Sequence, residues 1–173
     1  MPGSSTMADL CAMGWAQSTA TTNDATANAT VIAPIAITNG ATLEFGNVVA
    51  GAGTVTIAAA DGARTDSTTA LTPGGQKGTV RAATFNVTGE GTSTYAITLP
   101  SNAVTLSDGA GVPNTMTVNA FTVAAGTTGS VAGAIGTLAA GAGVLNVGAT
   151  LNVAALQAPG SYTGTYAVTV AYN

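Results

Sequence analysis

Residues 161–173 read SYTGTYAVTVAYN, a stretch in which bulky and small side chains alternate. The bulky side chains of one parity are Tyr162, Tyr166, Val168, Val170 and Tyr172. The other parity holds Thr163, Thr165, Ala167, Thr169 and Ala171, which are small or carry a hydroxyl. Because successive side chains of a β-strand point to opposite faces, this stretch predicts a strand with one face in a core.

The same alternation recurs along the chain and predicts further strands at 29–37, 43–49, 55–57, 82–88, 94–99 and 144–154. Between Met116 and Val123 the apolar parity changes, which predicts a β-bulge or a change of sheet near Asn119-Ala120. Asn39-Gly40 predicts a tight turn. Loops are expected at 59–78, 107–114 and 124–143, the last with a short strand around 134–138.

This pattern predicts an all-β fold, since no segment shows a sustained apolar period of 3.6 residues. Roughly eight or nine short strands separated by turns favour an antiparallel β-sandwich, with a closed barrel as the competing architecture. A membrane barrel fits less well, because aromatic residues make up only 5% of the chain and such barrels need aromatic girdles. We expect an N-terminal extension at 1–24 and one sandwich domain at 25–173.

The composition excludes several classes of partner. Charged residues make up 6% of the 173 residues, against a usual ~25%, and the net charge is −4. The three cations, Arg64, Lys77 and Arg81, are too few to neutralise a run of phosphates, so we expect no binding to nucleic acid. No apolar run reaches the ~18 residues of a membrane helix, so we expect no direct membrane insertion. A hydroxyl-rich surface without charge repulsion suits a protein that associates.

The chain has no histidine, the commonest general base and metal ligand, so we expect no enzyme, cofactor or metal. Asp61 and Asp66 share a predicted loop, but two carboxylates are weak evidence for calcium. Lys77 is expected to be exposed, which argues against an isopeptide bond. Cys11 is the only cysteine, so it forms no internal disulfide.

Several motifs in order carry a family resemblance over residues 25–173. They are ATANATV at 25–31, LEFG at 43–46, ATFNVTG at 83–89, YAITLP at 95–100, LNVGATL at 145–151 and GSYTGTY at 160–166. With these motifs the chain resembles the bacterial "domain of unknown function 4402" family, and its C-terminal pattern is similar to spore-coat-U-like and other chaperone–usher pilins. The resemblance implies a secreted or cell-surface protein of a Gram-negative-type bacterium with an immunoglobulin-like sandwich. It supplies no catalytic residues.

The pilin analogy adds a mechanism, in which an incomplete sandwich is completed by a donor strand from a neighbouring subunit. The donor candidate is the segment from Ala8 to about Asn28. One face of it carries Leu10, Ala12, Gly14 and Ala16, and the opposite face carries Met13 and Trp15 beside Cys11. The open alternative is that this segment packs on its own domain.

We therefore expect a structural subunit of a bacterial extracellular filament. It would be a homopolymer of itself, with a periplasmic chaperone and an outer-membrane usher as assembly partners. The alternative is a monomeric cell-surface adhesin or biofilm-matrix binding module. Clustered exposed aromatic side chains would favour the adhesin.

Overall fold

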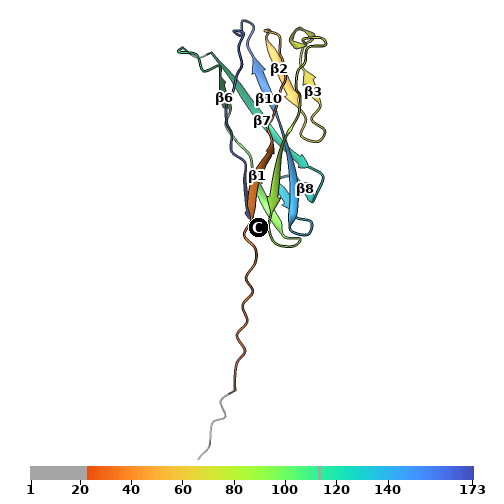
Figure 1. Ribbon diagram of the computed structural model, residues 1–173, viewed down its shortest axis with the longest axis vertical. Coiled ribbons are helices and arrows are strands. Elements are labelled where there is room, and N and C mark those ends of the chain that lie inside the picture. The colour runs from red at the N-terminus through yellow and green to blue at the C-terminus, as the bar shows by residue number, and fades with distance from the viewer. Residues whose placement is uncertain (1–22, 113) are drawn as a thin grey trace, which may run out of the picture. The chain divides into compact units, whose positions relative to one another are not determined.

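The computed structural model describes residues 23–112 and 114–173 of the chain. The chain divides into two compact units, Met1–Val31 and Ile32–Asn173. In the first unit the described residues, 23–31, are exposed and belong to no strand or helix. The second unit contains every strand described below (Figure 1).

Eleven strands and one short 3-10 helix, η1 (Thr69–Leu71), make up the described secondary structure. The strands are β1 (Ala36–Ala41), β2 (Gly53–Ile57), β3 (Arg64–Asp66), β4 (Ala83–Thr88), β5 (Thr94–Thr98), β6 (Val104–Ser107), β7 (Thr115–Ala125), β8 (Ser130–Ala132), β9 (Ile135–Thr137), β10 (Ala142–Val153) and β11 (Thr169–Tyr172). They form two antiparallel sheets, so the predicted all-β sandwich is confirmed. No helix among the described residues has the length and apolarity to cross a membrane.

Strand β10 is the centre of the larger sheet. One edge of β10 pairs with β7, and the other edge pairs first with β4 and then, beyond Val147, with β2. β1, β3 and β6 are added outside β4, β2 and β7. The side chains of Leu145, Val147, Leu151 and Val153 alternate inward along β10 and are buried.

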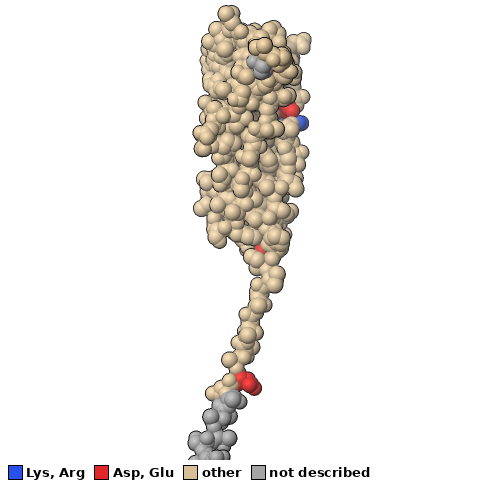
Figure 2. All heavy atoms as spheres, turned by 90° about the vertical axis from the view of Figure 1, so that its left-hand side faces the viewer, with Lys and Arg blue, Asp and Glu red and all other residues tan. Residues whose placement is uncertain are grey.

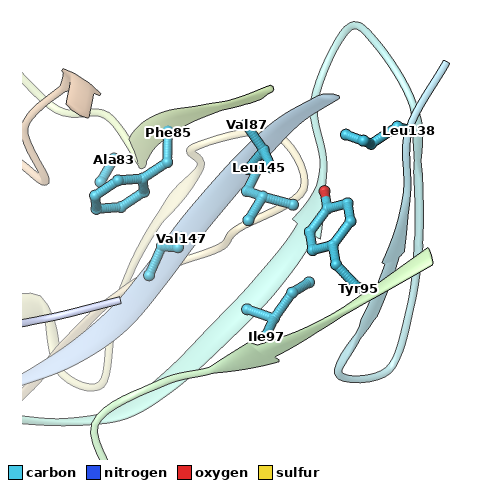
Figure 3. Packing of buried hydrophobic residues seen from close by; sticks show 8 residues of the cluster. All are labelled: Ala83, Phe85, Val87, Tyr95, Ile97, Leu138, Leu145 and Val147. Atoms are coloured by element: carbon cyan, nitrogen blue, oxygen red, sulfur yellow. The ribbon is translucent and has the colours of Figure 1, made fainter. Parts of the chain in front are cut away.

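The smaller sheet has the order β11-β5-β9-β8 and packs on the first half of β10. Tyr95 and Ile97 of β5 point toward Val87 of β4 and toward Leu145 and Val147 of β10 (Figure 3). Tyr95 is 1% exposed, so this cluster is a closed core between two layers.

A second buried cluster lies over the other half of β10. It consists of Val55, Leu71, Met116, Val118, Ala149, Leu151 and Val153. No strand of the smaller sheet contributes to it, and partly buried side chains from 43–48, Leu106, Phe121 and Tyr162 pack on it instead. The two halves of the sandwich are therefore covered in different ways.

Several sequence predictions are confirmed. The strands expected at 82–88, 94–99 and 144–154 correspond to β4, β5 and β10, and the short strand expected near 134–138 is β9. The bulge expected near Asn119-Ala120 is present: the register of β7 against β10 shifts there, and Ala120 has a φ of 50°. This bulge explains why Met116 and Phe121 both face the core although their parities differ.

Two predictions at the start of the domain are wrong. The strand expected over 29–37 begins only at Ala36, and the segment before it has no ladder partner. Asn39-Gly40 does not form a turn but lies inside β1, where the register against β4 shifts. Gly40 allows this close approach, since a Cβ there would lie 2.8 Å from Oγ1 of Thr84.

The extent of the predicted strands at 161–173 and 43–49 is also wrong. Only Thr169–Tyr172 forms a ladder, although the alternation of exposure continues back to Tyr162. In 43–49 only an isolated bridge from Glu44 to Arg81 is present. Four short elements were not predicted: β6, β8 inside the expected loop at 124–143, and β3 and η1 inside the expected loop at 59–78.

The closed core makes a stability prediction. Leu145→Ala should lower the free energy of unfolding by about 2–5 kcal/mol, because Leu145 is 0% exposed at the centre of the larger sheet. Leu156→Ala, at a side chain that is 95% exposed, is the matched control and should change it by less than about 0.5 kcal/mol. Urea denaturation measures both. Equal stability of the two variants would contradict this account of the core.

Candidate functional site

An apolar groove of about 860 Å³ lies over the second half of β10. Its two walls are the segments 42–50 and 157–166, and its floor is formed by β6, β7 and β10. We refer to this hollow as the apolar groove. Neither wall is a regular strand, although strands were predicted at 43–49 and from Ser161 onward.

The floor of the groove is apolar throughout. Its side chains are Val104, Leu106, Met116, Val118, Phe121, Leu151 and Val153. They reach the groove because each strand turns alternate side chains to this face, and the bulge in β7 brings Phe121 to the same side as Val118. Met116, Val118, Leu151 and Val153 are only 2–7% exposed, whereas Val104, Leu106 and Phe121 are half-buried, so the floor is an extension of the hydrophobic core beneath the groove.

The first wall, 42–50, forms backbone hydrogen bonds along only one of its two edges. Glu44 exchanges two hydrogen bonds with Arg81 (both 3.0 Å), and the N–H groups of Asn47 and Val49 donate to Lys77 O and Leu71 O. Within the described residues, the N–H groups of Leu43, Phe45 and Val48 donate no hydrogen bond. Because successive peptide groups of an extended chain point to opposite edges, Leu43 and Phe45 direct theirs away from Arg81.

The second wall, 157–166, also has one free edge. Thr163 exchanges two backbone hydrogen bonds with Ser107 of β6, at 2.8 and 2.9 Å. By the same alternation, Gly164 and Tyr166 direct their N–H groups away from β6, and neither donates a hydrogen bond within the described residues. Unpaired strand edges of this kind accept an added strand.

Aromatic side chains from the second wall border the groove. The Tyr162 hydroxyl donates to Ala158 O at 2.7 Å and accepts from Nε2 of Gln157 at 2.8 Å. The ring of Tyr166 lies 5.0 Å from that of Phe121 and 6.3 Å, edge-on, from that of Phe85. Burial raises the pKa of Tyr166 to about 12, so its hydroxyl stays neutral at physiological pH.

A buried arginine holds the first wall in place. The Arg64 guanidinium pairs with Asp66 at 2.6 Å, and their side chains are only 3% and 9% exposed. It also donates to three backbone carbonyls: Phe45 O (2.9 Å), Asn47 O (2.6 Å) and Leu71 O (3.3 Å). Arg64 therefore ties β3 to the wall through carbonyl oxygens and leaves the N–H groups of Leu43 and Phe45 without a partner among the described residues.

The charge on Asp66 is kept by this network. Burial by itself would raise the pKa of Asp66, but hydrogen bonds from Arg64 and from the Thr72 hydroxyl (2.8 Å), together with the positive charge of Arg64, outweigh it and lower the pKa below 3.8. Asp61 accepts from the N–H of Ala63 in its own turn. Asp66 is thus committed to Arg64 rather than to a cation shared with Asp61.

The groove offers binding surface rather than reactive groups. Glu44 is the only charged residue among those that line it, and it pairs with Arg81 at 3.5 Å with both side chains about half exposed. Glu44 thus faces away from the core. Lys77 is exposed, as expected. In the described part of the chain, no group of three or more Cys, Asp or Glu residues is arranged to hold a metal.

The predicted donor residues, Leu10, Ala12, Met13, Gly14, Trp15 and Ala16, lie outside the described residues. The sequence analysis proposed a missing strand but did not identify the residues that would receive it. The signal available was the coincidence of two strand-like stretches, 43–49 and 161–166, that the structure leaves without full ladders. Alternation alone does not reveal which backbone edges stay unpaired.

Comparison with protein-family models identifies a family. A family model described as "Domain of unknown function (DUF4402)" matches residues 35–172. No curated protein and no solved structure matches the chain.

The Arg64–Asp66 pair makes a prediction about acid stability. The folded-state pKa of Asp66 lies below 3.8, so its contribution to stability is complete above that pH and is lost as the pH falls through the folded value. Asp66→Asn should lower the free energy of unfolding by about 3–5 kcal/mol at neutral pH, because it leaves a buried guanidinium without its partner. It should also flatten the fall in stability below pH 4.

Glu44→Gln is the matched control, since the exposed Glu44–Arg81 pair contributes only about 0–1 kcal/mol. Thermal or urea unfolding between pH 2 and pH 7 measures both variants. If Asp66→Asn and Glu44→Gln lose the same stability, the wall does not depend on the buried pair.

Proposed function

The chain belongs to this family of domains of unknown function, and from that premise we propose that it is a structural subunit of an extracellular filament. The subunits assemble when the N-terminal segment of one copy completes the sandwich of the next. The observation that carries this proposal is the apolar groove, whose two walls both have a free backbone edge.

An added strand satisfies what the groove lacks. Backbone N–H groups of Leu43, Phe45, Gly164 and Tyr166 would gain partners, and apolar side chains of alternate parity would cover the floor. A small-molecule ligand could fill the volume but would leave these backbone groups unpaired along both walls. The length of the two free edges favours an extended polypeptide as the occupant.

The low charge of the surface supports self-association. The face shown in Figure 2 is built almost entirely of uncharged residues, so copies approach without electrostatic repulsion. We place the assembled protein at the bacterial cell surface, with a periplasmic chaperone that would cover the groove before assembly and an outer-membrane usher. No catalytic role is proposed.

The adhesin alternative has less support from the described residues. Exposed large hydrophobic side chains there are Val31, Ile32, Val49, Val112, Ile135 and Leu156, and none is aromatic. Sugar-binding surfaces commonly use exposed aromatic rings. Such rings offer a flat apolar face for stacking, and tyrosine and tryptophan also offer a polar group for hydrogen bonds. A filament subunit needs no such rings.

Negative-stain electron microscopy and sedimentation of the purified full chain test the proposal, and filaments are expected. Val49→Asp should raise the concentration needed for assembly at least about tenfold, because a charge in the apolar groove opposes strand insertion. Ile135→Asp is the matched control, since Ile135 is similarly exposed (49% against 44%) but does not line the groove.

The control should assemble as the unmodified chain does, and circular dichroism should show that both variants fold. Dispersed monomers of the unmodified chain at all concentrations would exclude the filament proposal. A glycan-binding screen would then test the adhesin.

A further inference from the structure

We infer that residues 25–31 are the donor strand and that they fill the apolar groove of a second copy, not their own. This inference rests on the proposed function and identifies the segment that would perform it. It differs from the earlier expectation that Leu10–Ala16 provides the inserted side chains.

The stretch 25–31 reads ATANATV, with apolar side chains at alternate positions. In an extended chain Ala25, Ala27, Ala29 and Val31 share one face, and Thr26, Asn28 and Thr30 share the other. Val31 is 96% exposed, although valine is normally among the most buried residues. Residues 23–32 are all exposed and make no hydrogen bond within the described part of the chain.

This stretch matches the groove in size and chemistry. Seven extended residues span about 23 Å, which is shorter than the first wall at 42–50. Small alanine side chains suit a groove already narrowed by Phe45, Tyr162 and Tyr166. Residues 25–31 contain no charge, so no ionised group would be buried, and Asp24 lies just outside the stretch.

The chain leaves the sandwich at the end opposite the groove. Ala33 is held there by two hydrogen bonds: its N–H donates to Oε2 of Glu90, and the Tyr172 hydroxyl donates to Ala33 O, both at 2.9 Å. The N–H of Glu90 donates to the same Tyr172 hydroxyl at 2.6 Å. We refer to these contacts of Ala33, Glu90 and Tyr172 as the clamp. The N–H of Gly89 donates to Gly141 O, so the clamp lies at the Ala142 end of β10.

Residues 25–31 cannot fill the groove of their own molecule, because most of the stretch cannot reach it. Along β10 the groove extends from about Gly148, which pairs beside Phe121, to Val153, and these residues lie about 20 and 36 Å from Ala142. Val31 is two residues from Ala33 and reaches at most about 7 Å, and Ala25 reaches at most about 28 Å. Ala16, seventeen residues from Ala33, reaches up to about 60 Å and is not excluded by this limit.

A donor that cannot serve its own groove must act between copies. Because the donor leaves one end of the sandwich and the groove lies toward the other, the contact joins different surfaces of the two copies and leaves both terminal subunits able to add another. An 8–16 donor would lack this constraint, since a copy could close its own groove and stop assembly.

Three double variants of the full chain separate the candidates. Ala27→Asp with Ala29→Asp places two charges on the proposed inserted face, and Asn28→Asp with Thr30→Asp places the same charges on the opposite face. Leu10→Asp with Ala12→Asp tests the earlier donor. All six positions precede the sandwich, so circular dichroism and the unfolding midpoint should be unchanged. Assembly is measured by sedimentation under reducing conditions, with electron microscopy of each pellet.

We expect the 27/29 variant to raise the concentration needed for assembly at least about tenfold, and the 28/30 and 10/12 variants to leave it unchanged. If the 10/12 variant blocks assembly and the 27/29 variant does not, the filament function stands but this donor assignment is wrong. If the 27/29 and 28/30 variants fail equally, charge rather than strand insertion is responsible, and the assignment is again wrong. If the unmodified chain does not assemble, the function and the donor fall together.

Discussion

The second half of β10 carries an apolar face that the smaller sheet does not cover, and the rest of the site follows from that constraint. Leu151 and Val153 continue the inward alternation of Leu145 and Val147, but no strand of the smaller sheet packs on them. Burial of apolar area gains roughly 25 cal/mol per Å², so this face must find cover. The chain supplies it with two separate extended segments, 42–50 and 157–166, and the space between them is the groove.

Arg64 shows how such a wall can be held while one of its edges stays free. A strand paired on both edges would close the groove, whereas a segment paired on neither would not be held in place. The wall is paired with residues 71–81 on one edge, and Arg64 adds to this hold because its guanidinium bonds the carbonyls of Phe45 and Asn47 from β3. A buried guanidinium requires an anion, and Asp66 provides it at 2.6 Å. In a chain with three cations, this is a structural use of one of them.

The alternation of side chains predicted correctly those strands that have both a buried apolar face and hydrogen-bonded ladder partners. It failed for segments that have a buried face but few backbone partners. β4, β5 and β10 follow their patterns because each has an apolar face on a core and ladder partners as well. At 162–168 bulky half-buried side chains still mark one face as predicted, yet the backbone finds few partners. At 43–49 the alternation itself fails after Gly46, which has a φ of 73°, so that Val48 rather than Val49 packs on the core. The period of two reports which face is buried and carries no information on edges. β3 was missed because Arg64 and Asp66, read as loop polarity, are buried as a pair.

The low charge of the chain and the small side chains of residues 25–31 suit the same physical task. Surfaces with few charges give little electrostatic steering, so the choice and register of a partner must come from shape and from backbone hydrogen bonds. Each alanine adds little hydrophobic free energy, and an inserted strand of alanines would therefore depend on the free N–H groups of both walls as much as on the floor. A strand whose binding depends on both walls binds only where both free edges are present. Strands elsewhere in the sandwich that are paired on both sides offer no such edges. A segment made of alanine, threonine and asparagine can therefore still be selective for this one groove.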